Sequence, residues 1–371
     1  MGKRGKIECL INISSKFHMK EVPVIIFGAG GVGRELLKQI VNGRANTSSR
    51  NNLQFNIVAI ADSKQWAKDV NGLSDEQILN IASAKLKREP IGEDRPDATG
   101  MIETLYEEGV RGAILVDITA VSSMEPTMAR AIELGYGIVL ANKKALAGPW
   151  ETAAQFYNNP MVRHESTVGG GQPVIATMRY LLDTNDPVLE VSGQFSGTLG
   201  YIAQRMDEEE DFSAAVAEAK MKGYTEPDPR EDLGGLDVMR KALILARMAG
   251  WELEQSDIEV ESLYPSSMEH LSVPEFMQAV VALNGSVRDR FQAAAEEGNV
   301  LRYLAIVNEK GGKVGLSPMP KSSSTANLKF ISFDTGNYHD ENLMLIGKGA
   351  GVEMTAAGVV GDMIDLAREQ L

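Results

Sequence analysis

The sequence of 371 residues has one cysteine, Cys9, and a deficit of basic residues. One cysteine cannot form an internal disulfide or a thiolate metal cluster, so a reducing compartment such as the cytoplasm is expected. No apolar run approaches the roughly 20 residues that span a bilayer, which predicts a soluble protein without membrane partners. The 37 lysines and arginines face 51 acidic residues, for a net charge of −14. This excess argues against binding to nucleic-acid phosphates or to an anionic membrane.

Strand and helix patterns alternate along the first part of the chain. A β-branched run, VPVIIF (22–27), precedes the glycine cluster GAGGVG and an amphipathic stretch, RELLKQIV. Further strands are expected in FNIVAIAD, GAILVDITA and YGIVLANKKAL. A polar insert, NGRANTSSRNN, is expected after the first helix, and a helix plus a loop over residues 63–96. The alternation predicts an α/β fold with a doubly wound parallel sheet of Rossmann type.

Gly28, Gly30 and Gly33 have the spacing of the dinucleotide fingerprint and stand between a strand and a helix. The first glycine permits a tight turn, the second lets the backbone approach a pyrophosphate, and the third lets the helix approach the strand. We therefore expect a dinucleotide here, the alternative being a plain structural turn. Asp62, which ends the next strand, is placed to accept the ribose 2′-hydroxyl of NAD. The serine and lysine that follow it are equally placed to receive the 2′-phosphate of NADP, so both cofactors stay open.

The chain divides into four parts. Residues 1–19 are a short basic leader that is expected to be disordered. They weakly resemble a transit segment, which leaves a plastid location open. An N-terminal extension from an earlier start site explains them equally well. Residues 20–150 carry the nucleotide-binding pattern. Residues 151–340 are richer in glycine and β-type runs and predict an α+β lobe with a hairpin near 299–319. Residues 341–371 hold a glycine-rich turn and a helix, which we expect to return to the first domain beside the cofactor.

An acidic turn precedes an apolar helix that contains a lysine, in GYTEPDPREDLGGLDVMRKALILAR (223–247). Helical spacing places Asp237 and Lys241 on one face, and we expect Lys241 to be half-buried beside Asp237. One interpretation is an ion pair between Asp237 and Lys241 within the helix. The other acids of the turn would then only stabilise the N-terminus of a helix. The second is a pocket in which the lysine moves a proton and the acids bind a substrate ammonium. Lys143, in the ANKK turn after a strand, is either a solvated lysine or part of the same crevice.

The segment ESTVGGGQ (165–172) is a glycine nest with one leading carboxylate. Its backbone carbonyls suit a hard cation, but a plain glycine loop between lobes explains it equally well. The preceding His164 is expected to be a packed histidine, because no second histidine or cysteine stands at ligand spacing.

Taken together, these motifs resemble the homoserine dehydrogenase family over about residues 20–371. The resemblance rests on FGAGGVG, DITA, ANKKAL, HESTVGGGQPVI, FSGTLGYI, the acidic segment from 223 to 247, and GAGVEMTAAGVVGD. The details are most similar to the monofunctional plant-type and fungal enzymes. The resemblance implies NAD- or NADP-dependent interconversion of L-homoserine and L-aspartate 4-semialdehyde on the route to threonine and methionine. It also implies a homodimer formed through the second lobe.

The resemblance further implies roles for individual residues. Lys241 would be the catalytic proton donor, with Lys143 and Asp237 beside it. Lys241, Glu226, Asp232 and Asp237 would form the substrate site, the carboxylates holding the amino group. Glu165 and the carbonyls of Val168, Gly170 and Gln172 would bind a monovalent metal such as sodium. The implied cofactor-binding residues are Gly28, Ala29, Gly30, Gly31, Val32, Gly33, Asp62, Thr119, Ala120, Lys143, Gly223 and Gly351.

Two other functions remain open at this point. One is a dehydrogenase of another amino-acid semialdehyde, which only substrate profiling separates. The other is a dinucleotide-sensing protein without catalysis, which would be expected to lose Lys143 or Lys241. Since no further segment follows the final helix, we also expect a monofunctional enzyme with little feedback inhibition by threonine.

Overall fold

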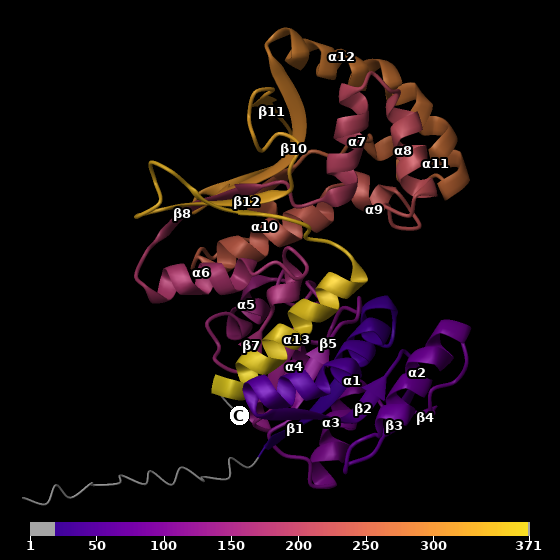
Figure 1. Ribbon diagram of the computed structural model, residues 1–371. Helices are drawn as coiled ribbons and strands as arrows, with labels where there is room; N and C mark the ends of the chain where they lie inside the picture. The colour runs from indigo at the N-terminus through magenta and orange to yellow at the C-terminus, as the bar shows by residue number, and fades with distance from the viewer. Residues whose placement is uncertain (1–18, 370–371) are drawn as a thin grey trace, which may run out of the picture.

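The computed structural model describes residues 19–369, so the predicted leader lies outside the described residues except for Met19. Two lobes are stacked along the long axis of the molecule (Figure 1). The first has a seven-stranded sheet in the order β4-β3-β2-β1-β5-β6-β7. Its elements are β1 (Lys20–Phe27), α1 (Gly31–Asn51), β2 (Leu53–Ala61), β3 (Gln65–Lys68), α2 (Asp75–Lys87), β4 (Glu93–Asp94), α3 (Ala98–Glu107), β5 (Ile114–Asp117), α4 (Glu125–Glu133), β6 (Gly137–Leu140), α5 (Trp150–Ala153) and β7 (Val162–Arg163).

The predicted doubly wound sheet is confirmed. β2, β1, β5, β6 and β7 run parallel, and only the short outer strands β3 and β4 pair antiparallel. The inner strands β5 and β6 are buried throughout, as expected for a parallel sheet covered by helices on both faces. Because β7 pairs with β6, this sheet continues past residue 150, where the sequence had placed the domain boundary.

One local expectation in this lobe was wrong and a second was incomplete. The polar insert after the first helix is itself helical, because α1 continues to Asn51. Tertiary contacts hold these polar turns: Arg44 donates to the Phe55 carbonyl oxygen and pairs with Asp75. The stretch from 63 to 96 contains the expected helix, α2, but also the strands β3 and β4, whose few residues give too short a pattern to detect.

The second lobe is built on a six-stranded sheet in the order β13-β12-β8-β10-β11-β9. The predicted hairpin is present as the antiparallel pair β10 and β11, which closes at Asn308 opposite Gly311. The helix that carries Lys241, α10, contacts β8, β10 and β11. The elements are α6 (Val174–Asp183), β8 (Val188–Gly193), α7 (Gly197–Asp207), α8 (Phe212–Met221), α9 (Arg230–Leu233), α10 (Leu236–Met248), β9 (Ile258–Val260), α11 (Val273–Ala279), α12 (Asn284–Glu296), β10 (Asn299–Asn308), β11 (Gly311–Pro320), β12 (Phe330–Thr335) and β13 (Leu343–Ile346).

The last helix, α13 (Val352–Glu369), leaves the second lobe and lies along α1 of the first (Figure 1). Lys20 donates to the Ala367 carbonyl oxygen, and Gln39 donates to that of Glu353. The C-terminal helix therefore packs on the first lobe, and its place beside the cofactor stays a prediction. No helix within residues 19–369 is long and apolar enough to cross a bilayer.

Candidate active site

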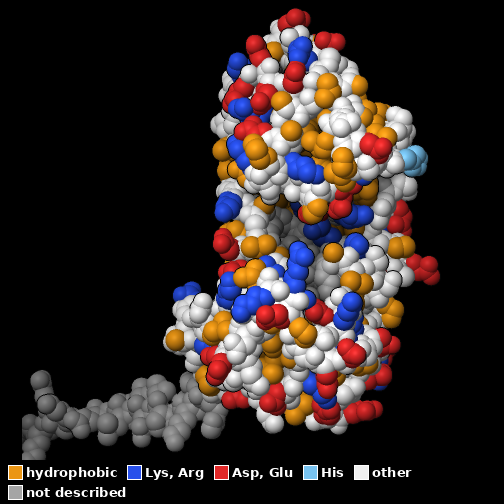
Figure 2. Space-filling view, turned by 90° about the vertical axis from the view of Figure 1, so that its right-hand side faces the viewer, with side chains coloured by type: hydrophobic (Ala, Val, Ile, Leu, Met, Phe, Trp, Pro, Cys, Tyr) orange, Lys and Arg blue, Asp and Glu red, His pale blue; other side chains and the backbone are white. Residues whose placement is uncertain are grey.

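A cleft separates the two lobes, and lysine and arginine side chains gather on its walls (Figure 2). The first lobe contributes the carboxyl ends of its parallel strands, the edge at which open α/β sheets bind ligands. The second lobe contributes the N-terminus of α10 and the connection from β8 to α7. Residues far apart in the chain, such as Lys143 and Asp237, therefore meet in this cleft.

The glycine turn between β1 and α1 has the geometry that a dinucleotide requires. Gly28 adopts a positive φ of 111° and lies so close to Ile118 that a Cβ would stand 2.9 Å from its carbonyl oxygen. A Cβ on Gly33 would stand 2.1 Å from the Gly28 carbonyl oxygen, so the helix approaches the strand as predicted. A Cβ on Gly30 meets nothing within 4 Å, and no side chain caps α1. The open N-terminus of α1 thus offers free N–H groups to a phosphate.

Asp62 directly follows the last residue of β2, but its carboxylate is already engaged. Oδ1 accepts N–H groups from Lys64 and Gln65 at 2.8 Å each, and Oδ2 pairs with Lys85 at 2.7 Å. Partial burial raises the pKa of Asp62, but the bonds from Lys85 and the two amides outweigh it and leave the pKa lowered. Arg95 adds a further cation, because its Nε donates to the Asp62 carbonyl oxygen at 2.8 Å.

Asn142 and Asp117 belong to the site, although the sequence did not single them out as functional residues. Asn142 is buried, and its amide donates to Asp117 Oδ2, Thr119 Oγ1 and the Val121 carbonyl oxygen. Asp117 is fully buried; burial raises its pKa, although it also accepts the N–H and the hydroxyl of Thr119. Together they tie the turn after β5 to the turn after β6. The only available signal was their position at the ends of consecutive strands.

Asp237 joins the two lysines that the sequence singled out. Its Oδ2 lies 2.6 Å from Lys241 Nζ, one helical turn away in α10, and its Oδ1 lies 3.3 Å from Lys143 Nζ on the opposite lobe. Burial alone would raise the pKa of Asp237, but the two ammonium groups outweigh it and lower the pKa. Lys241 Nζ also donates to the Phe195 carbonyl oxygen at 2.9 Å, which fixes its position above the cleft.

In the acidic turn of residues 226–232, one carboxylate has a structural partner and others are available to a ligand. Asp228 pairs with Arg230 at 2.7 Å and therefore has a structural partner. Asp232 accepts the backbone N–H of Glu226, which holds the two acids side by side. Partial burial and the charge of Asp232 raise the pKa of Glu226, while Lys143 opposes this shift. Glu226 and Asp232 thus form a crowded anionic corner beside the Lys143–Asp237–Lys241 group.

The loop predicted to bind a metal caps a helix. Both carboxylate oxygens of Glu165 accept N–H groups at 2.8 Å, from Ile175 and Ala176 in the first turn of α6. The carbonyl oxygen of Gln172 accepts the Val174 N–H. Among residues 19–369, no group of three or more histidine, cysteine, aspartate or glutamate side chains could hold a metal ion. His164 is buried against Tyr157, the packed histidine that was expected.

The remaining predicted cofactor residues lie at two places. Thr119 and the exposed Ala120 stand on the turn after β5, close to the glycine loop. Gly351 has a φ of 120° and precedes Val352, whose side chain would touch a Cβ on Gly31. Gly223, by contrast, is an exposed residue after α8, where its role stays a prediction.

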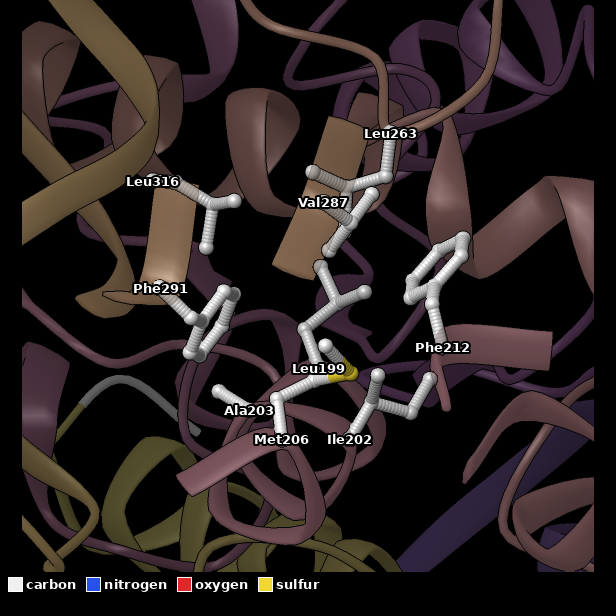
Figure 3. A pocket seen from close by; sticks show the side chains of 9 residues that line it. All are labelled: Leu199, Ile202, Ala203, Met206, Phe212, Leu263, Val287, Phe291 and Leu316. Carbon is white, nitrogen blue, oxygen red and sulfur yellow. The ribbon is translucent and has the colours of Figure 1, made fainter. Parts of the chain in front are cut away.

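An apolar pocket of the second lobe is unsuited to this chemistry. It lies among α7, α8, α12 and β11, and every side chain in Figure 3 is apolar. The lining residues are Leu199, Ile202, Ala203, Met206, Phe212, Leu263, Val287, Phe291 and Leu316. None of them can donate or accept a proton.

Two family models match the chain. Residues 28–161 match "Homoserine dehydrogenase, NAD binding domain", and residues 173–364 match "Homoserine dehydrogenase". The chain belongs to the homoserine dehydrogenase family. It is 35% identical to a homoserine dehydrogenase of Schizosaccharomyces pombe, over 93% of this chain and 95% of the relative.

Other homoserine dehydrogenase relatives are longer than this chain. It is 36% identical to a chloroplastic bifunctional aspartokinase/homoserine dehydrogenase of Zea mays, a match that covers 95% of this chain but 39% of the relative. Among solved structures, a Candida auris protein described as of unknown function is 31% identical with a TM-score of 0.83, covering 95% of this chain and 99% of that one. The homoserine dehydrogenase of Thermoplasma acidophilum shares the fold, with a TM-score of 0.69 at 23% identity over 94% and 99% of the two chains.

Proposed function

We propose that this chain catalyses the reversible NAD(P)-dependent interconversion of L-homoserine and L-aspartate 4-semialdehyde, and so serves threonine and methionine biosynthesis. The observation that carries the proposal is the Asp237 carboxylate, which lies between Lys143 of the first lobe and Lys241 of the second. A dinucleotide-sensing protein has no use for two lysines held in this way.

The geometry supports a proton-transfer role for Lys241. The nicotinamide cofactor supplies the hydride for aldehyde reduction and accepts it for alcohol oxidation. In reduction, Lys241 stabilises the alkoxide that develops on the carbonyl oxygen and gives it a proton. In oxidation, the same amino group takes up the proton of the hydroxyl. Asp237 holds both lysines in place, and Lys143 adds a second positive charge to the pocket.

Glu226 and Asp232 support recognition of the substrate ammonium. Burial raises the pKa of both groups, and neighbouring carboxylates add to the effect. A bound ammonium relieves this repulsion through charge-assisted hydrogen bonds. The anionic corner therefore favours an amino acid over an uncharged aldehyde.

For the cofactor, we propose a site that accepts the 2′-phosphate of NADP. The Asp62 carboxylate already accepts two amides and Lys85, so its charge is balanced. Lys85 and Arg95 place two cations at the end of β2, and Lys64 follows Asp62 by two residues; this suits a phosphate better than a bare hydroxyl.

A sodium ion at residues 165–172 is a further proposal. The donors would be the Glu165 carboxylate and the carbonyls of Val168, Gly170 and Gln172, a set of hard oxygens without sulfur or nitrogen. Glu165 and Gln172 keep lone pairs beyond the N–H groups they accept, so the set fits such an ion. Sodium chloride compared with choline chloride tests it: a sodium-dependent rise in Tm should be absent in Glu165→Gln.

We also propose a homodimer formed by the outer face of the second sheet. Strand pairing places Ile306, Ser192, Ser332 and Met344 in one row across β10, β8, β12 and β13. This row lies on the face opposite the core side chains of Val191 and Phe333. The side chains of this row are small or apolar, which suits sheet-to-sheet packing between two copies.

The location in the cell is proposed to be a reducing compartment. The single cysteine supports either the cytoplasm or a plastid. Imaging of a fluorescent fusion to the C-terminus of the full chain distinguishes them.

Initial rates test the proposed function. L-homoserine and L-aspartate 4-semialdehyde are each assayed with NAD(H) and NADP(H), beside the hydroxyl amino acid and semialdehyde one methylene longer. We expect the four-carbon pair to have the highest kcat/KM. Faster turnover of the longer pair would indicate a different semialdehyde dehydrogenase, and cofactor binding without any turnover would indicate a sensor.

A further inference from the structure

Lys329 is a half-buried lysine that lies beside the site and has no role in the mechanism proposed above. It stands directly before β12, and the backbone on either side of it is fixed by Gln194. The Gln194 side chain donates to the Leu328 carbonyl oxygen at 2.9 Å, and its backbone N–H donates to that of Phe330 at 3.0 Å. The start of the Lys329 side chain is thus held against the connection from β8 to α7.

The side chain of Lys329 reaches the first residue of α7. A Cβ built on Gly197 would lie 2.4 Å from Lys329 Nζ, so the ammonium occupies the space that a side chain there would need. Two residues earlier, the Phe195 carbonyl oxygen accepts the bond from Lys241 Nζ. Lys241 and Lys329 therefore approach the same short segment, residues 195–197.

Lys329 Nζ has no hydrogen bond or ion pair with any residue from 19 to 369. The absence is unusual, because lysines that lose water are normally paired. Burial lowers the pKa of Lys329, and the nearby charges of Lys241 and Lys348 lower it further. An anion placed beside Lys329 removes this repulsion, so the cluster is suited to a negatively charged ligand.

We propose that Lys329 binds the α-carboxylate of the amino-acid substrate and selects substrates that carry this group. The proposal rests on the function proposed above. Glu226 and Asp232 offer negative charge for the ammonium, Lys241 faces the reacting oxygen, and Lys329 offers the positive charge that the carboxylate needs. A zwitterionic substrate is thereby held by its two charged ends around the proton donor.

A cofactor phosphate is the other anion that could meet this lysine. Lys348, in the glycine turn before α13, stands four residues before Val352, whose side chain would touch a Cβ on Gly31 of the dinucleotide loop. Lys329 is instead fixed to the segment that binds Lys241. The geometry therefore favours the substrate carboxylate, and the experiment separates the two anions.

The test compares L-homoserine with L-homoserinamide, which lacks the negative charge, in wild type, Lys329→Gln and the control Lys321→Gln. Lys321 is an exposed lysine of the same β11–β12 connection. The preference for homoserine over homoserinamide is measured as the ratio of their kcat/KM values. We expect Lys329→Gln to lower this ratio about 10-fold to 100-fold, the range for a charge-assisted contact, and to leave the KM for the cofactor unchanged. Lys321→Gln should behave as wild type. An unchanged preference in a folded Lys329→Gln variant would overturn the proposal, and a raised cofactor KM alone would assign Lys329 to a phosphate.

Calorimetric binding separates this proposal from the proposed reaction. Wild type that binds homoserine more tightly than homoserinamide, with the difference lost in Lys329→Gln, supports the Lys329 site even if turnover of homoserine fails. Equal binding of the two compounds by wild type would exclude a carboxylate subsite at Lys329. Thermal melts of each variant check that the fold is kept.

Discussion

Asp237 illustrates how one side chain sets the chemistry of the site. Two lysines in contact with one carboxylate stabilise it as the anion. The negative charge in turn offsets the repulsion between the two ammonium groups, so they stay close together. Since Lys143 comes from the first lobe and Asp237 and Lys241 from the second, this contact also joins the lobes across the cleft. Loss of either lysine should therefore affect turnover more than folding.

We predict that Lys241→Ala lowers kcat by at least about 100-fold, the contribution expected of a positioned acid–base group. The proper control is Lys144→Ala, which removes a lysine adjacent to Lys143 that forms no ion pair among residues 19–369. Steady-state rates with homoserine, together with circular dichroism spectra, check the result. Near-normal kcat in folded Lys241→Ala would remove Lys241 from the mechanism.

We predict that Lys85→Met raises the KM for NADP more than that for NAD. The variant removes a cation at the end of β2 and leaves the Asp62 carboxylate without its ion-pair partner, so a 2′-phosphate meets net negative charge. Lys87→Met, two residues along the same helix and exposed, is the matched control. Equal changes for both cofactors would show that Lys85 supports the fold and does not read the 2′ position.

How far the sequence predicts individual site residues depends on their separation in the chain. The pair Asp237 and Lys241 follows from helical spacing, and the glycine turn follows from its place between a strand and a helix. Asn142 and Lys329 act through partners that only the folded chain brings together: Asp117 for the first, and Gln194 with Gly197 for the second. Single polar residues of this kind leave no periodic pattern.

At the scale of elements, α13 is fixed to the first lobe by buried charge. Arg163, on β7, pairs with Asp365 and Glu369 at 2.6 Å each, and Arg179 of α6 also pairs with Asp365. Asp362, one turn earlier, is buried and accepts the Glu165 N–H at 2.7 Å. These contacts fix the C-terminal half of α13, while Val352 at its other end lies beside Gly31 of the dinucleotide loop. Periodicity in the helix could not reveal these partners.

We predict opposite effects of two neighbouring substitutions in α13. Burial, and then the charge of Glu165, raise the pKa of Asp362 well above its usual value. The wild type therefore loses stability as the pH rises from about 4 towards that raised pKa, by up to about 1.4 kcal/mol per pH unit. Asp362→Asn avoids this loss and keeps an acceptor for the Glu165 N–H, so its Tm should exceed that of wild type at pH 8 but not at pH 4.

Asp365→Asn serves as the contrasting variant. Burial opposes ionisation of Asp365, but its bonds to Arg163 and Arg179 prevail and lower its pKa. This group stabilises the fold above its unfolded pKa and loses that effect as the pH falls, so Asp365→Asn should have a lower Tm at pH 8. Melting curves of both variants across pH measure the signs, and a decrease for Asp362→Asn at pH 8 would contradict the assignment.

At the scale of the whole molecule, the sequence predicts the layered architecture better than the boundaries of its parts. The alternation of strands and helices gave the parallel sheet, and the final helix returned to it as expected. The extent of α1 and the addition of β7 to the first sheet depend on tertiary contacts, such as Arg44 with Phe55 and β7 with β6. The outer face of the second sheet is likewise visible only once strand register is known.

That outer face provides the final prediction. Ile346 is 53% exposed on β13, and alternation places it on the same face as Met344, two residues earlier. If two copies pack by this face, Ile346→Glu buries a charge at the interface and should shift the protein from dimer to monomer. Leu86→Glu is the matched control, because Leu86 is 69% exposed on the first lobe. Sedimentation velocity over a range of concentrations should show a dimer for wild type and for Leu86→Glu, and a monomer for Ile346→Glu. An Ile346→Glu variant that sediments as wild type does would place the dimer contact elsewhere.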